Sequence, residues 1–506
     1  METIPFVEYN YNDDIIMFIF KCLGVTDILS CCCVSNDWNG LATSTIQIYF
    51  KQYANQNNAI LRKLITIDTL NLENNEIIND ESLSSLLNIK DLNLTKNTKI
   101  TNNGIYNLIN LTSLSMNSCM NVTSDALLML TNLVQLQIGN MQIDCLQFLT
   151  NLEDLCFCNN HYIIDQDLVS LTKLTKLCCT KTMINCVSCL TNLTGLNCND
   201  LIDDNSLVHL TKLRRLRTGY SDQITNNGIS NLTNLTCLDV ECSNDVTELG
   251  FEKLTNLTKL GVNDDLALSN QSIKNLTLLE NLKLKQIDTV TNEYLYLLTN
   301  LTDLSLPNDT ILNDYSLLTF TLLQNLELSP GDRYISDASI SQLTNLTELT
   351  IPDNDIITDL SIKMLTNLQT LEIENNSGKI TDESVSCLMN LTRLNLTSNS
   401  TITDIPLLFL TKLSALLLCD NTEITNECLS QLTNLNFLHL RANTVIVDET
   451  VKQLTNLSHL SICNNQMITE NSVIHLTRLS FLCACDGAII DVDQLTHMTN
   501  LVDIAI

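Results

Sequence analysis

The stretch Leu394–Asn421 reads LNLTSNSTITDIPLLFLTKLSALLLCDN and decides the fold. The pattern L-x-L-x-x-N occurs twice in it, starting at Leu394 and at Leu416, 22 residues apart. Between the copies lie I-T-D, an apolar segment and L-T-K-L. This unit recurs in 21 copies from Leu70 to Ile506, with spacings of 19 to 23 residues. The period predicts one continuous stacked array rather than several globular domains.

Each position of L-x-L-x-x-N has a physical task. The two leucines are expected to point inward on a short strand, and the residue between them to point outward on a concave face, because side chains alternate along a strand. The asparagine is expected to turn inward and to bond the backbone of the following turn, since buried unpaired amides and carbonyls are costly. The asparagines concerned are Asn75, Asn97, Asn160, Asn354, Asn376, Asn399, Asn421, Asn443 and Asn465.

The segments between the strands predict short helices on the convex side. In I-T-D, the threonine suits a helix N-cap and the acidic residue suits the first turn. In L-T-N-L, the asparagine is expected to adopt the left-handed conformation that ends a helix. That role accounts for the many N-L-T triplets without glycosylation.

The array is expected to be uneven along its length. Shortened spacings and substituted asparagines predict looser turns from about residue 136 to 335, and a more regular C-terminal half. The sequence closes on I-A-I without a polar cap, so Leu501, Ile504 and Ile506 are expected to form an exposed apolar end.

The repeats resemble leucine-rich repeats, whose L-x-x-L-x-L-x-x-[N/C] pattern extends over most of the chain. The resemblance implies an α/β solenoid of about 21 short parallel strands with short convex helices over residues 70–506. Residues 46–69 are predicted to be a connector and N-terminal cap.

Residues 1–45 are predicted to be a small all-helical domain. Asp14, Asp27 and a set of spaced apolar residues match the F-box pattern in register, although Tyr11-Asn12 stands in place of its Leu-Pro and Ser35 in place of its Cys. The segment therefore resembles an F-box, which implies binding to the Skp-type adaptor of a cullin complex. The residues implied to bind the adaptor are Ile15, Ile16, Ile19, Phe20, Leu23, Ile28, Leu29, Val34 and Trp38.

Composition narrows the choice of partners and compartment. A formal net charge of −30 argues against sequence-independent binding to nucleic acid or to an anionic membrane surface. No apolar run has the length of a membrane span, and the N-terminus lacks the pattern of a signal peptide. The 21 scattered cysteines follow no disulfide framework, so a cytoplasmic or nuclear, non-secreted protein with free thiols is expected.

Catalytic motifs are missing, so the chain is predicted to be no enzyme and to need no cofactor. Cys186-x-x-Cys189 has no second pair at zinc-site spacing. Cys156-x-Cys158 and Cys178-Cys179 lie in strand segments and are interpreted as structural thiols, with no metal site expected.

Two groups of predicted concave residues are candidates for binding a target protein. A basic group suits an acidic or phosphorylated segment, the alternative being solvated polar filler balanced by Asp239 and Glu241. It consists of Lys176, Arg215, Arg217, Lys259, Lys283 and Lys285. A C-terminal group suits a protein-binding hot spot, the alternative being packing against the uncapped end. It consists of Leu417, Phe437, His439, Arg441, His459, Phe481 and Cys483.

The two resemblances together imply a substrate-recognition subunit of a cullin–RING ubiquitin ligase, with a target protein on the concave face. The main alternative is a non-enzymatic leucine-rich repeat scaffold whose head is only a cap. An internalin-like surface adhesin would share the 22-residue period but would need a signal peptide and few free cysteines. A GTPase-activating repeat protein is a further alternative, for which no anchor residue is found.

Overall fold

The computed structural model describes residues 67–505 apart from 76, 181–183, 185, 199–201, 220–222, 241–245, 263–269, 285–291, 307–311, 376–377, 499 and 502. The predicted head, 1–45, and nearly all of the predicted connector, 46–69, lie outside the described residues. The chain divides into two compact units, Met1–Leu235 (unit 1) and Thr236–Ile506 (unit 2).

Both units repeat a short strand followed by a short helical turn. In unit 1 the strands are β1 (Thr69–Asn71), β2 (Asp91–Asn93), β3 (Ser113–Ser115), β4 (Gln135–Gln137), β5 (Asp154–Cys156), β6 (Lys176–Cys178), β7 (Gly195–Cys198) and β8 (Arg215–Thr218). The helices are α5 (Asp80–Leu83), α6 (Asn102–Ile105), α7 (Ser124–Leu127), η2 (Leu146–Phe148), α8 (Asp165–Leu168), η3 (Cys186–Cys189), α9 (Asp204–Leu207) and α10 (Asn226–Ile229).

In unit 2 the strands are β9 (Cys237–Val240), β10 (Lys259–Val262), β11 (Asn281–Leu284), β12 (Asp303–Leu306), β13 (Asn325–Leu328), β14 (Glu348–Thr350), β15 (Thr370–Glu372), β16 (Arg393–Asn395), β17 (Ala415–Leu417), β18 (Phe437–His439), β19 (His459–Ser461), β20 (Phe481–Cys483) and β21 (Asp503–Ala505). The helices are α11 (Glu248–Phe251), α12 (Asn270–Ile273), α13 (Asn292–Leu295), α14 (Asp314–Leu317), α15 (Asp337–Ile340), α16 (Asp359–Ile362), α17 (Asp382–Val385), α18 (Asp404–Leu407), α19 (Asn426–Leu429), α20 (Asp448–Val451), α21 (Glu470–Val473) and η4 (Val492–Leu495).

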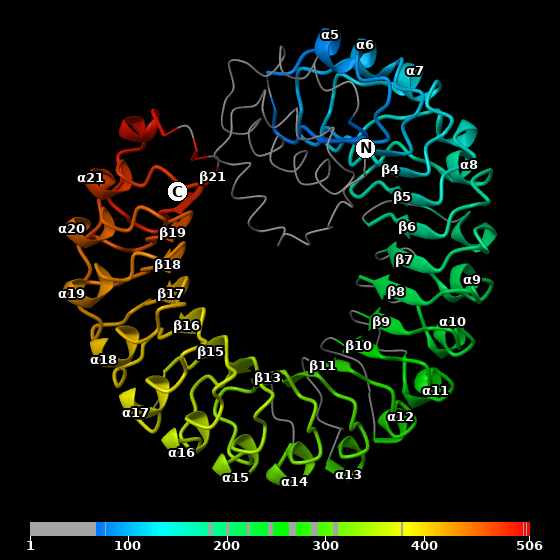
Figure 1. Cartoon of the computed structure of the whole chain (residues 1–506). Helices are drawn as coiled ribbons and strands as arrows, with labels where there is room; N and C mark the ends of the chain where they lie inside the picture. Colours follow the sequence, from blue (N-terminus) through cyan, green and yellow to red (C-terminus); the bar gives the residue numbers. More distant parts are fainter. Residues whose placement is uncertain are drawn as a thin grey trace, which may run out of the picture. The chain divides into compact units, whose positions relative to one another are not determined.

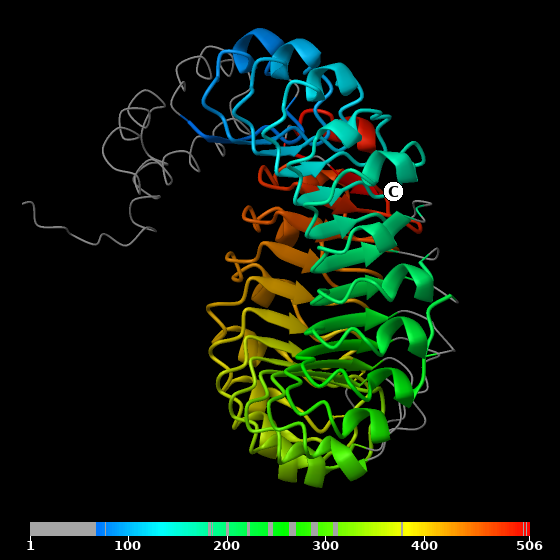
Figure 2. The same cartoon turned by 90° about the vertical axis from the view of Figure 1, so that its right-hand side faces the viewer.

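Consecutive strands within each unit lie side by side in parallel, with the same repeat position paired from strand to strand. Leu394 pairs with Leu416, and both are fully buried. In each unit the strands line one side and the helices the other (Figure 1). The core is made largely of the buried leucines of the repeats. Figure 2 shows the parallel strands of unit 1 from the side. The predicted solenoid of 21 short parallel strands with convex helices is confirmed.

The predicted asparagine ladder is confirmed at the described positions. The side-chain amide of Asn443 donates to the carbonyls of Asn421, at 2.8 Å, and Leu418, at 3.1 Å, in the preceding repeat. Its side-chain oxygen accepts from the backbone N–H groups of Val445 and Ile446, at 3.0 and 2.9 Å. Asn465 repeats the arrangement one unit later. Asn443 and Asn465 therefore each tie two neighbouring turns together and pair their own buried polar atoms.

The acidic residue after the N-cap joins neighbouring helices, a role beyond the predicted one at the helix dipole. Thr403 caps α18, and both its backbone N–H and its hydroxyl donate to the carboxylate of Asp382 in α17, at 2.8 and 2.6 Å. The same pair recurs between Asp359 and Thr381. These aspartates thus bond the next repeat as well as lying in the first turn of their own helix.

The expectation for the asparagine of L-T-N-L is wrong. The described non-glycine residues with positive φ instead stand before the ladder position, as Asp420 and Asn464 do. The L-T-N-L asparagines bond the preceding repeat, as when the Asn390 amide donates to the Thr366 carbonyl at 2.9 Å. The physical reason is that the L-T-N-L asparagine uses its side-chain amide to pair a carbonyl of the preceding repeat. The tight turn that requires a positive φ lies after the strand instead.

The predicted unevenness is visible along the chain. Two repeats of 19 residues carry the 3-10 helices η2 and η3, and strands β7 to β13 have four residues instead of three. At the last strand, Ile504 keeps 36% of its surface exposed. Among the described residues, no helix has the length and apolar character needed to cross a membrane.

Candidate functional site

An aromatic row crosses three adjacent strands on the concave face of unit 2. Phe437, His459 and Phe481 occupy the same register position on β18, β19 and β20. The His459 ring stacks on both neighbours, with ring centroids 6.0 Å from Phe437 and 5.8 Å from Phe481. The interplanar angles are 29° and 28°. The row is a preorganised, partly exposed aromatic surface of the kind that anchors protein partners.

Arg393 extends this row by one further member. Its guanidinium carbon lies 5.5 Å from the centre of the Phe437 ring, a cation–π contact. Ala415 is the intervening residue in the register, and its small side chain leaves room for Arg393 to reach across. The Nε atom of Arg393 lies 3.2 Å from the Glu372 carboxylate, which holds the guanidinium in place. Sequence reasoning missed the contact from Arg393 to Phe437, because that contact depends on the small size of Ala415, the residue between them in the register.

His439 and Arg441 lie beside the aromatic row on β18 and in the turn after it. Burial lowers the pKa of His439, and the positive charges of Arg441 and Arg393 lower it further. Arg441 also lies 3.8 Å from the Asp486 carboxylate, where both side chains are largely exposed. His439 is therefore a neutral hydrogen-bonding group at pH 7, and Arg441 is a weakly paired cation available to a partner.

Leu417 does not have the exposure that the sequence predicted for the C-terminal group. It is only 9% exposed, and the register places it between the side chains of Asn395 and His439. The aromatic row, with Arg393, His439 and Arg441, is called the aromatic patch below.

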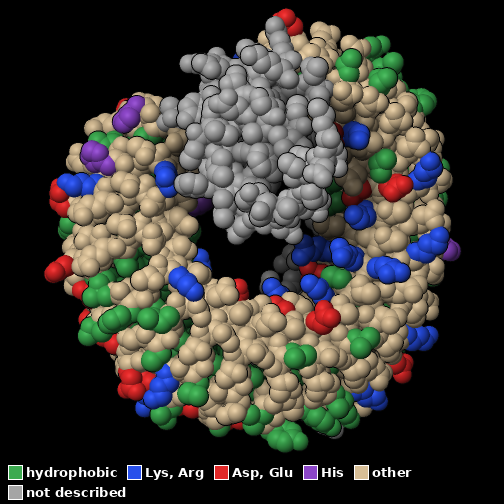
Figure 3. Space-filling model, in the orientation of Figure 1, with side chains coloured by type: hydrophobic (Ala, Val, Ile, Leu, Met, Phe, Trp, Pro, Cys, Tyr) green, Lys and Arg blue, Asp and Glu red, His purple; other side chains and the backbone are tan. Residues whose placement is uncertain are grey.

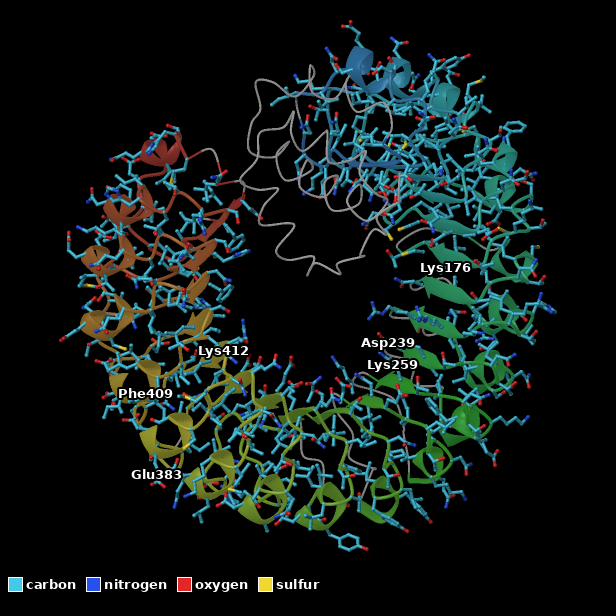
Figure 4. All side chains as sticks on the ribbon, viewed as in Figure 1. Lys176, Asp239, Lys259, Glu383, Phe409 and Lys412 are labelled. Carbon is cyan, nitrogen blue, oxygen red and sulfur yellow. The ribbon has the colours of Figure 1, made fainter. Side chains whose placement is uncertain are left out.

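The predicted basic group falls into two sets. In unit 1, Lys176 and Arg215 occupy one register row on either side of Gly195, and Arg217 lies on the same strand as Arg215; all three cations are exposed. Lys176 also pairs with the Asp154 carboxylate at 3.5 Å. Lys and Arg side chains gather over this part of the molecule (Figure 3), and Figure 4 marks Lys176 on the strand side.

In unit 2, Lys259 and Lys283 are exposed on β10 and β11. Asp239 lies in the same register row as Gly261 and Lys283. Its carboxylate leans over Gly261, where a Cβ atom would meet the Asp239 oxygen at 2.9 Å. The carboxylate thus offsets the positive charge of this set, and Lys285 lies outside the described residues.

The sequence analysis interpreted several cysteines as structural thiols. The structure brings most of these together in clusters on the strand faces. Cys179 belongs to the core, being 3% exposed. Cys156, Cys158 and Cys178 instead form one cluster, and Cys463, Cys483 and Cys485 another. Sequence spacing hid both clusters because each third thiol comes from a neighbouring repeat; aligning the repeats in rows would have revealed them.

Two family models match segments of the chain. Residues 12–46 match the F-box domain, a range that contains all nine predicted adaptor-binding residues, which lie outside the described part of the structure. Six copies of the BspA-type leucine-rich repeat region match within residues 244–362 and 288–410. No curated protein matches the chain.

The chain also matches solved structures from varied sources. An internalin from Listeria monocytogenes is 24% identical over 72% of this chain and 94% of its own, with a TM-score of 0.36. A leucine-rich repeat protein from Leptospira interrogans is 20% identical over 87% of this chain and 99% of its own, also with a TM-score of 0.36. Toll in its complex with Spätzle, from Drosophila, is 19% identical over 81% of this chain and 58% of its own, with a TM-score of 0.45.

The repeats, the parallel strands and the asparagine ladder define a leucine-rich repeat protein. Joined to the N-terminal F-box, they give the chain the architecture of an F-box/leucine-rich repeat protein. That architecture is typical of non-catalytic adaptor and interaction proteins.

Proposed function

We propose that this chain is the substrate-recognition subunit of a cullin–RING ubiquitin ligase. The F-box binds a Skp-type adaptor, and the concave face of the repeats holds a target protein. The observation that carries the proposal is the presence of both an F-box match and a leucine-rich repeat array in one chain. Because the thiols would stay reduced there, the cytosol or nucleus is the proposed compartment.

The contribution to ubiquitin transfer is one of position. Holding the target and the ligase in one assembly raises the effective concentration of target lysines at the ubiquitin donor. The chemistry itself belongs to partner subunits, and this chain needs no cofactor for that role.

The aromatic patch is the proposed target-binding surface. Its rings already stack on one another, so little side-chain entropy is lost when a partner covers them. Arg393, fixed between Glu372 and Phe437, and the exposed Arg441 add donors for carboxylates or carbonyls at either side. This combination of aromatic rings and arginine is what binding hot spots contain.

Co-expression with a Skp-type adaptor tests the ligase proposal. Full-length chain is expected to co-purify with the adaptor, and the double change Ile19→Asp and Trp38→Asp is expected to abolish recovery by placing charge in the predicted apolar interface. Phe409→Asp is the matched control, since Phe409 is 52% exposed on the helical side of the repeats (Figure 4). Equal adaptor recovery with the double variant would reject the ligase role and favour a plain repeat scaffold.

A further inference from the structure

Two clusters of three thiols lie on the strand faces, one in each unit. In unit 1, the Cys158 sulfur lies 3.7 Å from that of Cys156 and 3.2 Å from that of Cys178. In unit 2, the Cys483 sulfur lies 3.1 Å from that of Cys463 and 3.7 Å from that of Cys485. In each cluster all three sulfurs lie within 4.8 Å of one another.

Both clusters arise from the same arrangement of two neighbouring strands. A C-x-C pair places two thiols on one face of a strand, because alternate residues share a face. The parallel register then adds a third thiol from the adjacent repeat, where strands lie about 4.8 Å apart. Cys156 is paired with Cys178 in the first cluster, and Ser461 with Cys483 in the second.

A hydroxyl group occupies the fourth corner of each arrangement. Thr180 lies two residues after Cys178, and hydrogen bonds from its side chain and backbone reach Cys158. Ser461 lies two residues before Cys463, with its oxygen 3.8 Å from the Cys463 sulfur. Each cluster therefore groups three sulfurs with one hydroxyl, at two independent places in the array.

The spacing of the sulfurs suits a small thiophilic cation. A cation bound tetrahedrally at the usual zinc–sulfur distance of about 2.3 Å holds its sulfurs about 3.8 Å apart. The C-x-C pairs are already at 3.7 Å. The closer pairs, at 3.2 and 3.1 Å, need to open by about 0.6 to 0.7 Å to reach that spacing. The chain's net charge of −30 also favours cation binding.

We propose that each three-thiol cluster is a binding site for a divalent zinc ion, with three cysteine sulfurs as ligands and a fourth position open to the concave face. Binding displaces the thiol protons, so that the sulfurs bind as thiolates. Water fills the fourth position, beside the hydroxyl of Thr180 or Ser461. Thiolate ligands select zinc over magnesium or calcium, which prefer oxygen.

Metal stoichiometry of the reduced, full-length chain tests the proposal. After dialysis against zinc, elemental analysis is expected to find one zinc ion per chain fewer in Cys158→Ser than in the unmodified chain. Cys483→Ser is expected to lose one zinc ion per chain as well. The double variant is expected to lose two. Cys189→Ser and Cys387→Ser are the controls, since both cysteines are exposed and outside the clusters; neither is expected to change the stoichiometry.

Cobalt(II) substitution counts the sulfur ligands directly. Charge-transfer absorption from thiolate to cobalt is expected to correspond to three sulfurs per site. Ser461→Cys adds a fourth sulfur at the remaining corner, so the absorption from that site is expected to rise by about one third and its zinc affinity to increase. This gain does not depend on whether a cysteine-to-serine variant folds well.

Other outcomes would overturn the proposal. Equal zinc content in the cluster variants and the controls would reject the sites, and so would no added cobalt–sulfur absorption in Ser461→Cys. A reduced chain that leaves zinc unbound, but forms Cys158–Cys178 and Cys463–Cys483 disulfides on oxidation, would show that the clusters are redox pairs. Peptide mapping of the oxidised chain by mass spectrometry detects that result.

Discussion

The side-chain amide of Asn443 donates a hydrogen bond to the backbone carbonyl of Asn421, 22 residues earlier, at 2.8 Å. Asn465 in turn donates to the carbonyl of Asn443 at 2.9 Å. The ladder therefore links each of these turns to the one before it, through hydrogen bonds from a side-chain amide to a backbone carbonyl. This coupling between neighbours is what makes a stacked array stable, because each repeat contacts only the adjacent repeats.

Replacing Asn443 with alanine is expected to destabilise unit 2 by about 2–4 kcal/mol, because two backbone N–H groups lose their acceptor and two carbonyls lose a donor in a buried turn. Urea unfolding followed by circular dichroism measures the loss. Thr444→Ala is the control, since Thr444 is exposed in the same turn. A loss no greater than that of the control would show that water replaces the ladder at little cost.

Asp359 links acid stability to the bond between α16 and α17. Burial raises the pKa of its carboxyl, but the hydrogen bonds from Ser384 and Thr381 outweigh burial, so the pKa lies below its ordinary value. A lowered carboxyl pKa stabilises the fold above the unfolded value of about 3.9, and that stabilisation is lost as the pH falls through the folded value.

Asp359→Asn is expected to be less stable than the unmodified chain by about 1 kcal/mol at pH 7, and this gap should narrow at pH 3. Urea midpoints at the two pH values give the comparison. Asp355→Asn, which alters an exposed carboxylate in the same repeat, serves as the control and should show little gap at either pH. A gap for Asp359→Asn that stays the same at pH 7 and pH 3 would contradict the linkage.

The main features of the fold were accessible from sequence because they depend on local periodicity. Leu394 and Leu416 lie on adjacent parallel strands, both buried, as the 22-residue spacing predicted. The threonine caps were equally predictable, because a cap involves only residues two or three positions apart, as with Thr381 and Glu383.

Features that depend on contacts between repeats were not accessible in the same way. The carboxylate of Asp382 was predicted to act on its own helix, yet it bonds Thr403 in the next one. Arg393 reaches Phe437 across Ala415, and Cys178 meets a C-x-C pair from another repeat. In each case the partner is some 20 residues or more away in the sequence. Such contacts become visible only when the repeats are aligned under one another, so that residues at the same repeat position can be compared.

The titration of His439 tests the electrostatics of the aromatic patch. Its pKa is expected to lie below 6.5, because burial and the charges of Arg441 and Arg393 all disfavour the imidazolium. A lowered pKa for a base means that protonation opposes folding, so this residue's contribution to stability falls as the pH drops below about 6.5.

Nuclear magnetic resonance of chain labelled at the histidine Cε1 carbon measures this pKa directly. Arg441→Gln is expected to raise the pKa of His439, since it removes a nearby positive charge. Arg478→Gln is the matched control; Arg478 donates to the Asn456 side chain in the preceding repeat, and its loss should leave the titration unchanged. An unchanged His439 titration in Arg441→Gln would mean that Arg441 does not contribute to the lowered pKa.

Target capture is expected to depend on the two phenylalanines that enclose His459. The target is first identified by cross-linking and mass spectrometry with the unmodified chain, and its affinity is then measured for variants. Phe437→Ala and Phe481→Ala each remove a ring stacked on His459, at 6.0 and 5.8 Å between centroids. Each is expected to weaken binding by about 2 kcal/mol, roughly 30-fold in Kd.

Phe409→Ala provides the comparison, because it removes a phenylalanine that is 52% exposed on the helical side. Its affinity for the target should match that of the unmodified chain. If Phe437→Ala and Phe481→Ala also bind normally while Arg215→Glu does not, the target binds at the basic residues of unit 1 instead. The aromatic patch would then have a structural role in holding β18 to β20 together, and its loss would appear in the unfolding midpoint rather than in Kd.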